Sequence, residues 1–143
     1  MSGCLLGSMR QIVHLGDQYI ARRLKEENLP ILSAHIPLFY ILPQNGDGIL
    51  FNELCEKWSK SKSSLSDIIT KYVNSGLIKR CECQEDKRNI YIAMTPQAQE
   101  IKRVLDKICG EINEIVFGKT QPQDIDTFMK IIENMLSRGK EVL

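Results

Sequence analysis

The sequence lacks the features that mark several classes of protein. It has no run of about 20 apolar residues, which a membrane-spanning helix needs, and the longest apolar run, residues 36–42, is far shorter. The first residues show no basic segment followed by a sustained apolar one, as a signal peptide would. We therefore expect no membrane partner and a cytoplasmic location.

The residues that catalytic and metal sites need are also scarce. Two histidines leave few general bases, and there is no glycine-rich phosphate loop or Ser/His/Asp spacing. The cysteines number five and have no disulfide rhythm, which suits a reducing compartment. Cys81 and Cys83 lie closer together than zinc ligands usually do, and no second pair accompanies them. We expect no enzyme, no metal site and no cofactor.

Charge is balanced over the whole chain but not along it. The formal net charge is +1, so the protein is not a polycation. Between Lys57 and Arg88, however, there are eight basic and four acidic side chains. A neutral protein with a basic middle is typical of a DNA reader on an acidic scaffold. On charge alone, a solvated basic surface explains the pattern equally well.

Hydrophobic spacing predicts helices at both ends of the chain. Residues 5–27 carry apolar side chains three and four positions apart, as one face of a helix requires. A second helix is predicted over residues 34–42, with Ser33 as its N-cap. Thr95 as N-cap and Pro96 at the first helical position indicate the start of another helix. The two C-terminal helices are expected over residues 97–117 and 123–137.

The middle of the chain predicts two short helices joined by a tight turn. An extended piece, residues 49–51, leads into a helix over residues 52–58. After a turn at residues 59–60, Ser61 is a strong N-cap candidate for a helix over residues 62–74. The apolar stripe of that helix consists of Leu65, Ile68, Ile69, Tyr72 and Val73.

After Gly76 the hydrophobic period changes from helical to alternating. Residues 77–83 and 90–94 alternate on either side of a polar turn at residues 84–89, a pattern that predicts a β-hairpin. Helix, turn, helix and hairpin together form a winged helix-turn-helix, which we place at residues 49–95. The expected fold class is therefore mainly α with a small β-hairpin wing.

Short polar side chains line the free face of the helix over residues 62–74. Serine and threonine accept or donate hydrogen bonds, and their small size lets a helix lie deep in the major groove. Lys62 and Lys71 can reach phosphates, and the backbone N–H groups near Ser61 attract anions. A face that is merely solvated is the alternative. The predicted DNA contacts of this helix are Ser61, Lys62, Ser63, Ser66, Asp67, Thr70 and Lys71.

The hairpin tip carries a more specific signal. Asp86 precedes Arg88 by two residues at an exposed turn, with Lys87 between them. Asp86 can orient the guanidinium, which limits the entropy lost when Arg88 enters a minor groove. Lys87 would add a phosphate contact. Charged hairpin tips are commonly just solvated, but the position directly after a helix-turn-helix favours DNA binding.

With these motifs in place, the chain resembles the MarR family of bacterial and archaeal regulators over about residues 10–137. The resemblance implies that the helix matching residues 61–74 enters the major groove. It also implies that Arg88, oriented by Asp86, enters the minor groove, and that the first and last helices interlock in a homodimer. The residues that carry it are Glu53-Leu54, Ser61–Ser66, Gly76–Arg80, Asp86–Arg88 and Met94–Pro96.

The sequence departs from the family pattern at three positions, the mildest of which is Ala98 in place of a common glycine. Lys60 stands where the family usually has an apolar residue, so we expect a more exposed turn. Asp67 stands where a basic or polar residue is frequent. A carboxylate there repels phosphate but can accept a hydrogen bond from cytosine N4, which leaves the operator preference open.

Family members also suggest two forms of regulation. Many bind phenolic or aromatic acids between the dimer and DNA-binding parts, so we expect a small aromatic effector as a further partner. Histidine and aromatic side chains on the helices that could line such a pocket are, however, more often packing residues than ligand contacts. A branch of the family senses peroxides through a cysteine near the first helix, where Cys4 lies, whereas Cys55 and Cys109 fall on apolar faces. The candidate pocket residues are His14, Tyr19, His35, Phe39 and Tyr40.

These observations lead to one main hypothesis and one alternative. Residues 1–30 and 97–143 are expected to form the dimer, and residues 31–96 to bind DNA. The protein is then a homodimeric transcription regulator, a repressor that binds a pseudo-palindromic operator in double-stranded DNA until an effector releases it. The alternative is a winged helix used for protein–protein contact without its own operator, which Asp67 favours. The operator, the regulated genes and the effector do not follow from the sequence.

Overall fold

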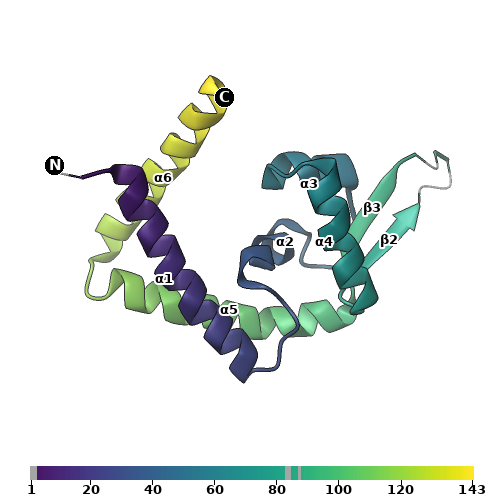
Figure 1. The fold of residues 1–143 in the computed structure, drawn as a ribbon, viewed down its shortest axis with the longest axis horizontal. Coiled ribbons are helices and arrows are strands. Elements are labelled where there is room, and N and C mark those ends of the chain that lie inside the picture. Colours follow the sequence, from purple (N-terminus) through teal and green to yellow (C-terminus); the bar gives the residue numbers. More distant parts are fainter. Residues whose placement is uncertain (1–2, 83–84, 87) are drawn as a thin grey trace. The chain divides into compact units, whose positions relative to one another are not determined.

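The computed structural model describes residues 3–82, 85–86 and 88–143 (Figure 1). The chain divides into two compact units, one ending at Cys109 and the other running from Gly110 to Leu143. The first unit holds a three-stranded sheet, and the boundary between the units falls within the helix Pro96–Phe117. None of the helices in the described part of the chain combines the length and apolar character that crossing a membrane would require.

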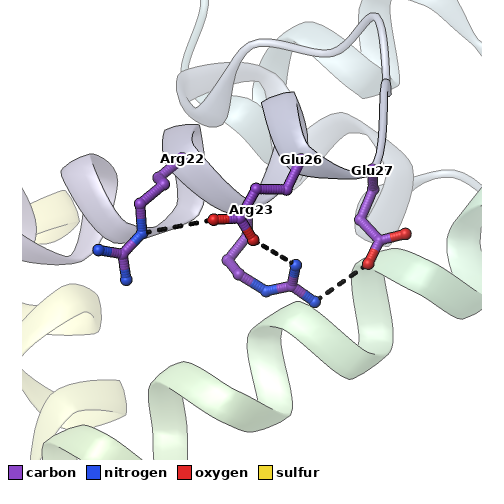
Figure 2. Close-up of polar contacts among 4 residues, drawn as sticks. All are labelled: Arg22, Arg23, Glu26 and Glu27. Atoms are coloured by element: carbon purple, nitrogen blue, oxygen red, sulfur yellow. Dashed lines mark hydrogen bonds and ion pairs between the residues drawn. The ribbon is translucent and has the colours of Figure 1, made fainter.

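The first helix, α1, spans Leu5–Glu26, one residue short of the predicted end. Its last turn carries a set of ion pairs (Figure 2). Glu26 accepts from Arg23 at 2.9 Å and lies 3.8 Å from the Nε of Arg22, while Arg23 also reaches Glu27 at 3.2 Å. Positive charge at a helix C-terminus is favourable, although partly exposed pairs of this kind each contribute only about 0–1 kcal/mol.

The segment after α1 differs from the sequence prediction. A 3-10 turn, Ser33–His35, precedes a short helix α2, Ile36–Ile41, where a single helix over residues 34–42 was expected. The assignment of Ser33 as an N-cap was wrong, because its Oγ donates instead to Oδ1 of Asp17 on α1 at 2.8 Å. A tertiary hydrogen bond has replaced the local one.

The predicted helix-turn-helix is confirmed. Strand β1, Ile49–Leu50, leads directly into α3, Phe51–Trp58, and α4 spans Lys62–Asn74. Ser59 ends α3 in the left-handed conformation, with φ at 53°. The Oγ of Ser61 accepts a hydrogen bond from the backbone N–H of Ser64 at 3.1 Å, as an N-cap does.

The hairpin is also confirmed, and the structure adds a third strand to it. β2, Ile78–Glu82, and β3, Ile90–Met94, are antiparallel, and β1 pairs with the other edge of β3. Gly76 supplies the positive φ of 79° that the chain needs between α4 and β2. The ends of β2 and β3 nearest the hairpin turn project beyond α3 and α4 (Figure 1).

The last two helices are α5, Pro96–Phe117, and α6, Pro122–Val142. Thr95 caps α5 as predicted, accepting from the N–H of Ala98 at 3.3 Å, and its hydroxyl also donates to the carbonyl of Gly76. α6 runs five residues past the predicted end. Within the second unit, the rings of Phe117 and Phe128 meet edge to face, 5.8 Å apart.

One hydrophobic core fixes the winged part of the chain. It buries the inner faces of α2, α3 and α4 together with β3 and one face of α5 from Ala98 to Ile108. Because α4 buries only one side here, its opposite side is left exposed. The largest fully buried side chains are Leu38, Phe39, Leu42, Leu54, Leu65, Ile69, Tyr72, Leu77, Ile92, Met94, Leu105 and Ile108.

Candidate nucleic-acid interface

The outer face of α4 is available to a partner. Its inner stripe is closed by Leu65, Ile69 and Tyr72, each with no exposed surface. The flanking Ile68 and Val73 of the predicted stripe are half-buried. Of the predicted contacts on this helix, Ser66 is half-buried and the others, Ser61, Lys62, Ser63, Asp67, Thr70 and Lys71, are exposed.

Tyr72 anchors α4 from the inside. Its hydroxyl accepts from the backbone N–H of Leu32 at 3.2 Å and lies 2.7 Å from Nδ1 of His35. Its ring meets Phe39 edge to face at 5.4 Å. Burial raises the pKa of the Tyr72 hydroxyl, which keeps it protonated. The orientation of α4 is therefore fixed by the segment that follows α1.

His35 lies in a position where its charge matters. Its ring contacts Trp58 at 6.2 Å and Tyr72 at 5.5 Å, both edge to face. Burial lowers the pKa of His35, and the positive charges of Lys71 and Lys60 lower it further. In the neutral imidazole, Nδ1 can accept a hydrogen bond from the Tyr72 hydroxyl, so the neutral form suits this site.

At the wing tip, Arg88 is exposed and held at the same time. Its side chain is 93% exposed, and Oδ1 of Asp86 accepts both its backbone N–H at 3.0 Å and its Nε–H at 3.3 Å. The guanidinium therefore projects into solvent with two contacts at its base. The third residue predicted here, Lys87, lies outside the described residues.

Sequence reasoning missed one residue that joins the wing to α4. Nη2 of Arg80, on β2, donates to Oγ1 of Thr70 on α4 at 2.9 Å. Arg80 also lines a cleft of about 250 Å³ together with Lys62 and Ser66. The available signal was the strand alternation, which places Arg80 on the same face as the buried Ile78.

Lys60 covers an aromatic ring at the turn where an exposed segment was expected. Its side chain is half-buried, and its Nζ lies 5.1 Å from the centre of the Trp58 ring. The aliphatic part of a lysine can cover apolar surface while the ammonium stays in water. The apolar residue usual at this position is thus replaced by a cation that still packs.

The five candidate pocket residues differ in exposure and in the contacts that the structure shows for them. Phe39 is fully buried and His35 half-buried, and both contact Tyr72. His14 is exposed and lines a groove along α1, whereas Tyr19 lies under the guanidinium of Arg22 at 5.2 Å. Tyr72 is thus a common neighbour of His35 and Phe39.

Tyr40, the fifth candidate, is tied to α5. Its hydroxyl donates to Oδ1 of Asp106 at 2.8 Å, and Nζ of Lys102 donates to the same oxygen and lies 3.9 Å from the centre of the Tyr40 ring. Burial raises the pKa of Tyr40, with contributions from Cys109 and Asp106. The hydrogen bond from Lys102 lowers the pKa of Asp106. This cluster holds α2 against α5.

The cysteines of the described residues differ in exposure. Cys4 is exposed at the N-cap of α1, Cys55 is buried and Cys109 is half-buried. Cys81 is exposed on β2, and Cys83, two residues later in the sequence, lies outside the described residues. Over residues 3–82, 85–86 and 88–143, no group of three or more His, Cys, Asp and Glu side chains is placed to hold a metal ion.

Comparisons with known proteins agree with this architecture. The transcriptional regulator HosA of Escherichia coli is 24% identical over 132 residues, which cover 91% of this chain and 95% of HosA. A MarR transcriptional regulator from Methanosarcina mazei has a TM-score of 0.83 at 21% identity, covering 96% of both chains. No family model matches the chain.

A third relative was crystallised with nucleic acid. It is a MarR family transcriptional regulator from Listeria monocytogenes in complex with a 26mer DNA. It has a TM-score of 0.82 at 18% identity, with 95% of this chain and 89% of that chain covered. The resemblance expected from the sequence is thus confirmed in the fold.

Proposed function

We propose that this chain, which has the fold of the MarR family of transcription regulators, is itself a transcription regulator that binds double-stranded DNA. In this proposal a homodimer binds a pseudo-palindromic operator and represses nearby genes until a small aromatic effector releases it. A regulator of this kind works in the cytoplasm, beside the DNA it reads.

The observation that carries the proposal is the arrangement of Arg88. The Arg88 side chain is 93% exposed, so packing gives little reason for Asp86 to hold its Nε–H. Such a side chain loses little further freedom when it enters a narrow minor groove, where the negative potential attracts arginine. The structure of the Listeria relative with DNA supports the same kind of partner.

The face of α4 fits the other groove. Apart from the Asp67 carboxylate, its exposed side chains are short and uncharged or cationic, and its first turn offers backbone N–H groups next to Ser61. A helix of this kind can approach base edges, while Lys62 and Lys71 are placed to contact phosphates. Major-groove contacts from α4 and a minor-groove contact from the wing would fix the protein on the duplex from two sides.

The homodimer is proposed from exposed apolar surface at both ends of the chain. Two-fold DNA sites need two readers, and burying these faces against a second copy removes them from water. We therefore assign residues 1–30 and 97–143 to the dimer and residues 31–96 to DNA binding. The exposed apolar side chains of these two segments include Leu5, Leu6, Ile12, Val13, Leu15, Ile115, Val116, Phe128, Met129, Ile131, Leu136, Val142 and Leu143.

Fluorescence anisotropy tests the proposal directly. The protein is titrated into a labelled duplex from the region upstream of its own gene, and into a shuffled duplex of equal composition. We expect tighter binding to the upstream duplex by a factor of about a thousand or more, as specific regulators show. Equal affinity for both duplexes, or none for either, would contradict the proposal.

A second candidate function has one observation in its favour. Asp67 is exposed on the face of α4 that would meet DNA, and its carboxylate repels phosphate. A winged helix that binds another protein would tolerate this charge more easily. We expect Asp67→Asn to change the affinity or sequence preference of a protein that reads DNA. A winged helix that binds only another protein would show no DNA binding with or without this change, so the variant separates the two functions.

A further inference from the structure

The hydrogen bond between Arg80 and Thr70 has a chemical consequence for the face that reads DNA. Nη2 of Arg80 donates to Oγ1 of Thr70 at 2.9 Å. A threonine hydroxyl has one hydrogen to donate and two lone pairs to accept with. Because an arginine occupies one lone pair and can only donate, the Thr70 hydrogen must turn away from it.

The position of Arg80 is set by the sheet. Arg80 pairs with Ile92 on the central strand β3, and α4 packs beside β2. Lys62, Ser66 and Arg80 line one cleft, so the guanidinium lies beside the exposed face of α4. Lys79 is also exposed, but strand alternation points its side chain to the opposite face of the sheet.

The Thr70 hydroxyl has no partner within its own helix among the described residues. A helical threonine often donates to the carbonyl four residues earlier, as Thr127 does to Gln123 on α6 at 2.9 Å. Thr70 makes its described contact with Arg80 instead. Its hydrogen is therefore available to an outside acceptor.

Building on the proposed function, we infer that Arg80 is a positioning residue that makes Thr70 a hydrogen-bond donor and so a determinant of base specificity. In the major groove, guanine presents O6 and N7, adenine N7 and thymine O4 as acceptors, whereas cytosine presents only its N4 donor. As a donor, Thr70 can thus form a hydrogen bond with guanine, adenine or thymine, and it discriminates against cytosine.

Asp67 gives the reading face a complementary group. It lies three residues before Thr70, about 4.5 Å along the helix axis, and is also exposed. A carboxylate only accepts hydrogen bonds, so it suits the cytosine N4 that Thr70 disfavours. An acceptor and a donor one turn apart define a direction of reading along the groove.

Selection from a random duplex library tests this inference. The wild type is compared with Thr70→Val, Arg80→Ala and the double variant, with Lys79→Ala as the matched loss of a cation from the same strand. Circular dichroism checks that each variant is folded. One hydrogen bond corresponds to a discrimination of roughly threefold to tenfold.

We expect wild type to disfavour cytosine by this factor at one position of each half-site. Thr70→Val, Arg80→Ala and the double variant should lose this preference equally and at that position alone, because the two residues act as one unit. Lys79→Ala should keep it. The salt dependence of the affinity, measured for each variant, shows whether a phosphate contact was lost as well.

Two results would overturn the inference while leaving the proposed function intact. One is a preference retained in Arg80→Ala but lost in Thr70→Val. The other is a uniform loss of affinity in Arg80→Ala with an unchanged motif and a weaker salt dependence, which would make Arg80 a phosphate contact. If wild type enriches no motif, both the proposed function and the inference fail.

Discussion

Two possible roles of the Asp86 carboxylate beside Arg88 lead to opposite predictions for DNA binding. If Asp86 only adds negative charge near DNA, removing it should tighten binding. If it orients Arg88 through the contacts at 3.0 and 3.3 Å, removing it should weaken binding. The Arg88 side chain is 93% exposed and that of Asp86 is 41% exposed, so substituting either residue should leave the fold intact.

We expect Arg88→Ala to weaken DNA binding by about 1–3 kcal/mol. Asp86→Ala should also weaken it, by a smaller amount, despite making the protein more positive. Anisotropy at a fixed salt concentration measures both. Tighter binding by Asp86→Ala would show that the carboxylate does not position Arg88, and an unchanged affinity for Arg88→Ala would remove the wing from the interface.

His35 leads to a prediction about pH. Burial, Lys71 and Lys60 lower its pKa in the folded protein below the ordinary value of 6.5. Between these two pKa values the unfolded chain binds the extra proton, so stability rises with pH. The contribution is fully present above about pH 6.5 and is lost as the pH falls towards the folded pKa.

We therefore expect a lower free energy of unfolding at pH 5.5 than at pH 7.5, measured by urea denaturation, with a smaller difference in His35→Gln. His14→Gln is the matched control, because His14 is the other histidine and is exposed on α1. An identical pH dependence in wild type and His35→Gln would show that the contacts of His35 with Tyr72 do not require its neutral form.

At the scale of elements, serine shows what the sequence can and cannot predict. Ser61 and Ser33 each precede an apolar segment, yet only Ser61 accepts from a backbone N–H in the next turn. The partner of Ser61 is three residues away, whereas that of Ser33 is Asp17 on another helix. Local chemistry is visible in sequence, and competition from a distant side chain is not.

The same distinction explains the candidate site. The helix bounds, the cap and the exposed face of α4 follow from periodicity within a few residues. The bond from Arg80 to Thr70 and the pairing of β1 with β3 depend on how α4 and the sheet are brought together. Residues that join elements were therefore missed, although strand alternation already placed Arg80 on the same face of β2 as the buried Ile78.

The N-cap of α4 gives a prediction for the element that reads DNA. Ser61→Ala removes the acceptor for the Ser64 N–H and should lower the free energy of unfolding by about 0.5–2 kcal/mol. Ser63→Ala, two residues further along and also exposed, should change it by less than about 0.5 kcal/mol. Thermal unfolding followed by circular dichroism compares them, and equal losses would contradict the capping role.

For the whole molecule, the question is how a chain with a net charge of +1 binds a polyanion. The basic side chains that matter are gathered in the winged part, so the overall charge says little about the local field. Binding to DNA releases counterions in proportion to the phosphates neutralised, and this number can be measured without knowing the operator contacts.

If each protomer of a dimer neutralises about four phosphates, the logarithm of the affinity should fall with the logarithm of salt concentration with a slope near −7. A single protomer would give about half that slope. Anisotropy titrations over a range of salt concentrations measure it, and analytical ultracentrifugation of the complex counts the chains per duplex. The two readouts must agree, because each added protomer brings its own Lys62, Lys71 and Arg88.

A slope near zero would leave the winged helix without a nucleic-acid partner and favour the protein-binding alternative. Half the slope with one chain per duplex would keep DNA binding and remove the homodimer.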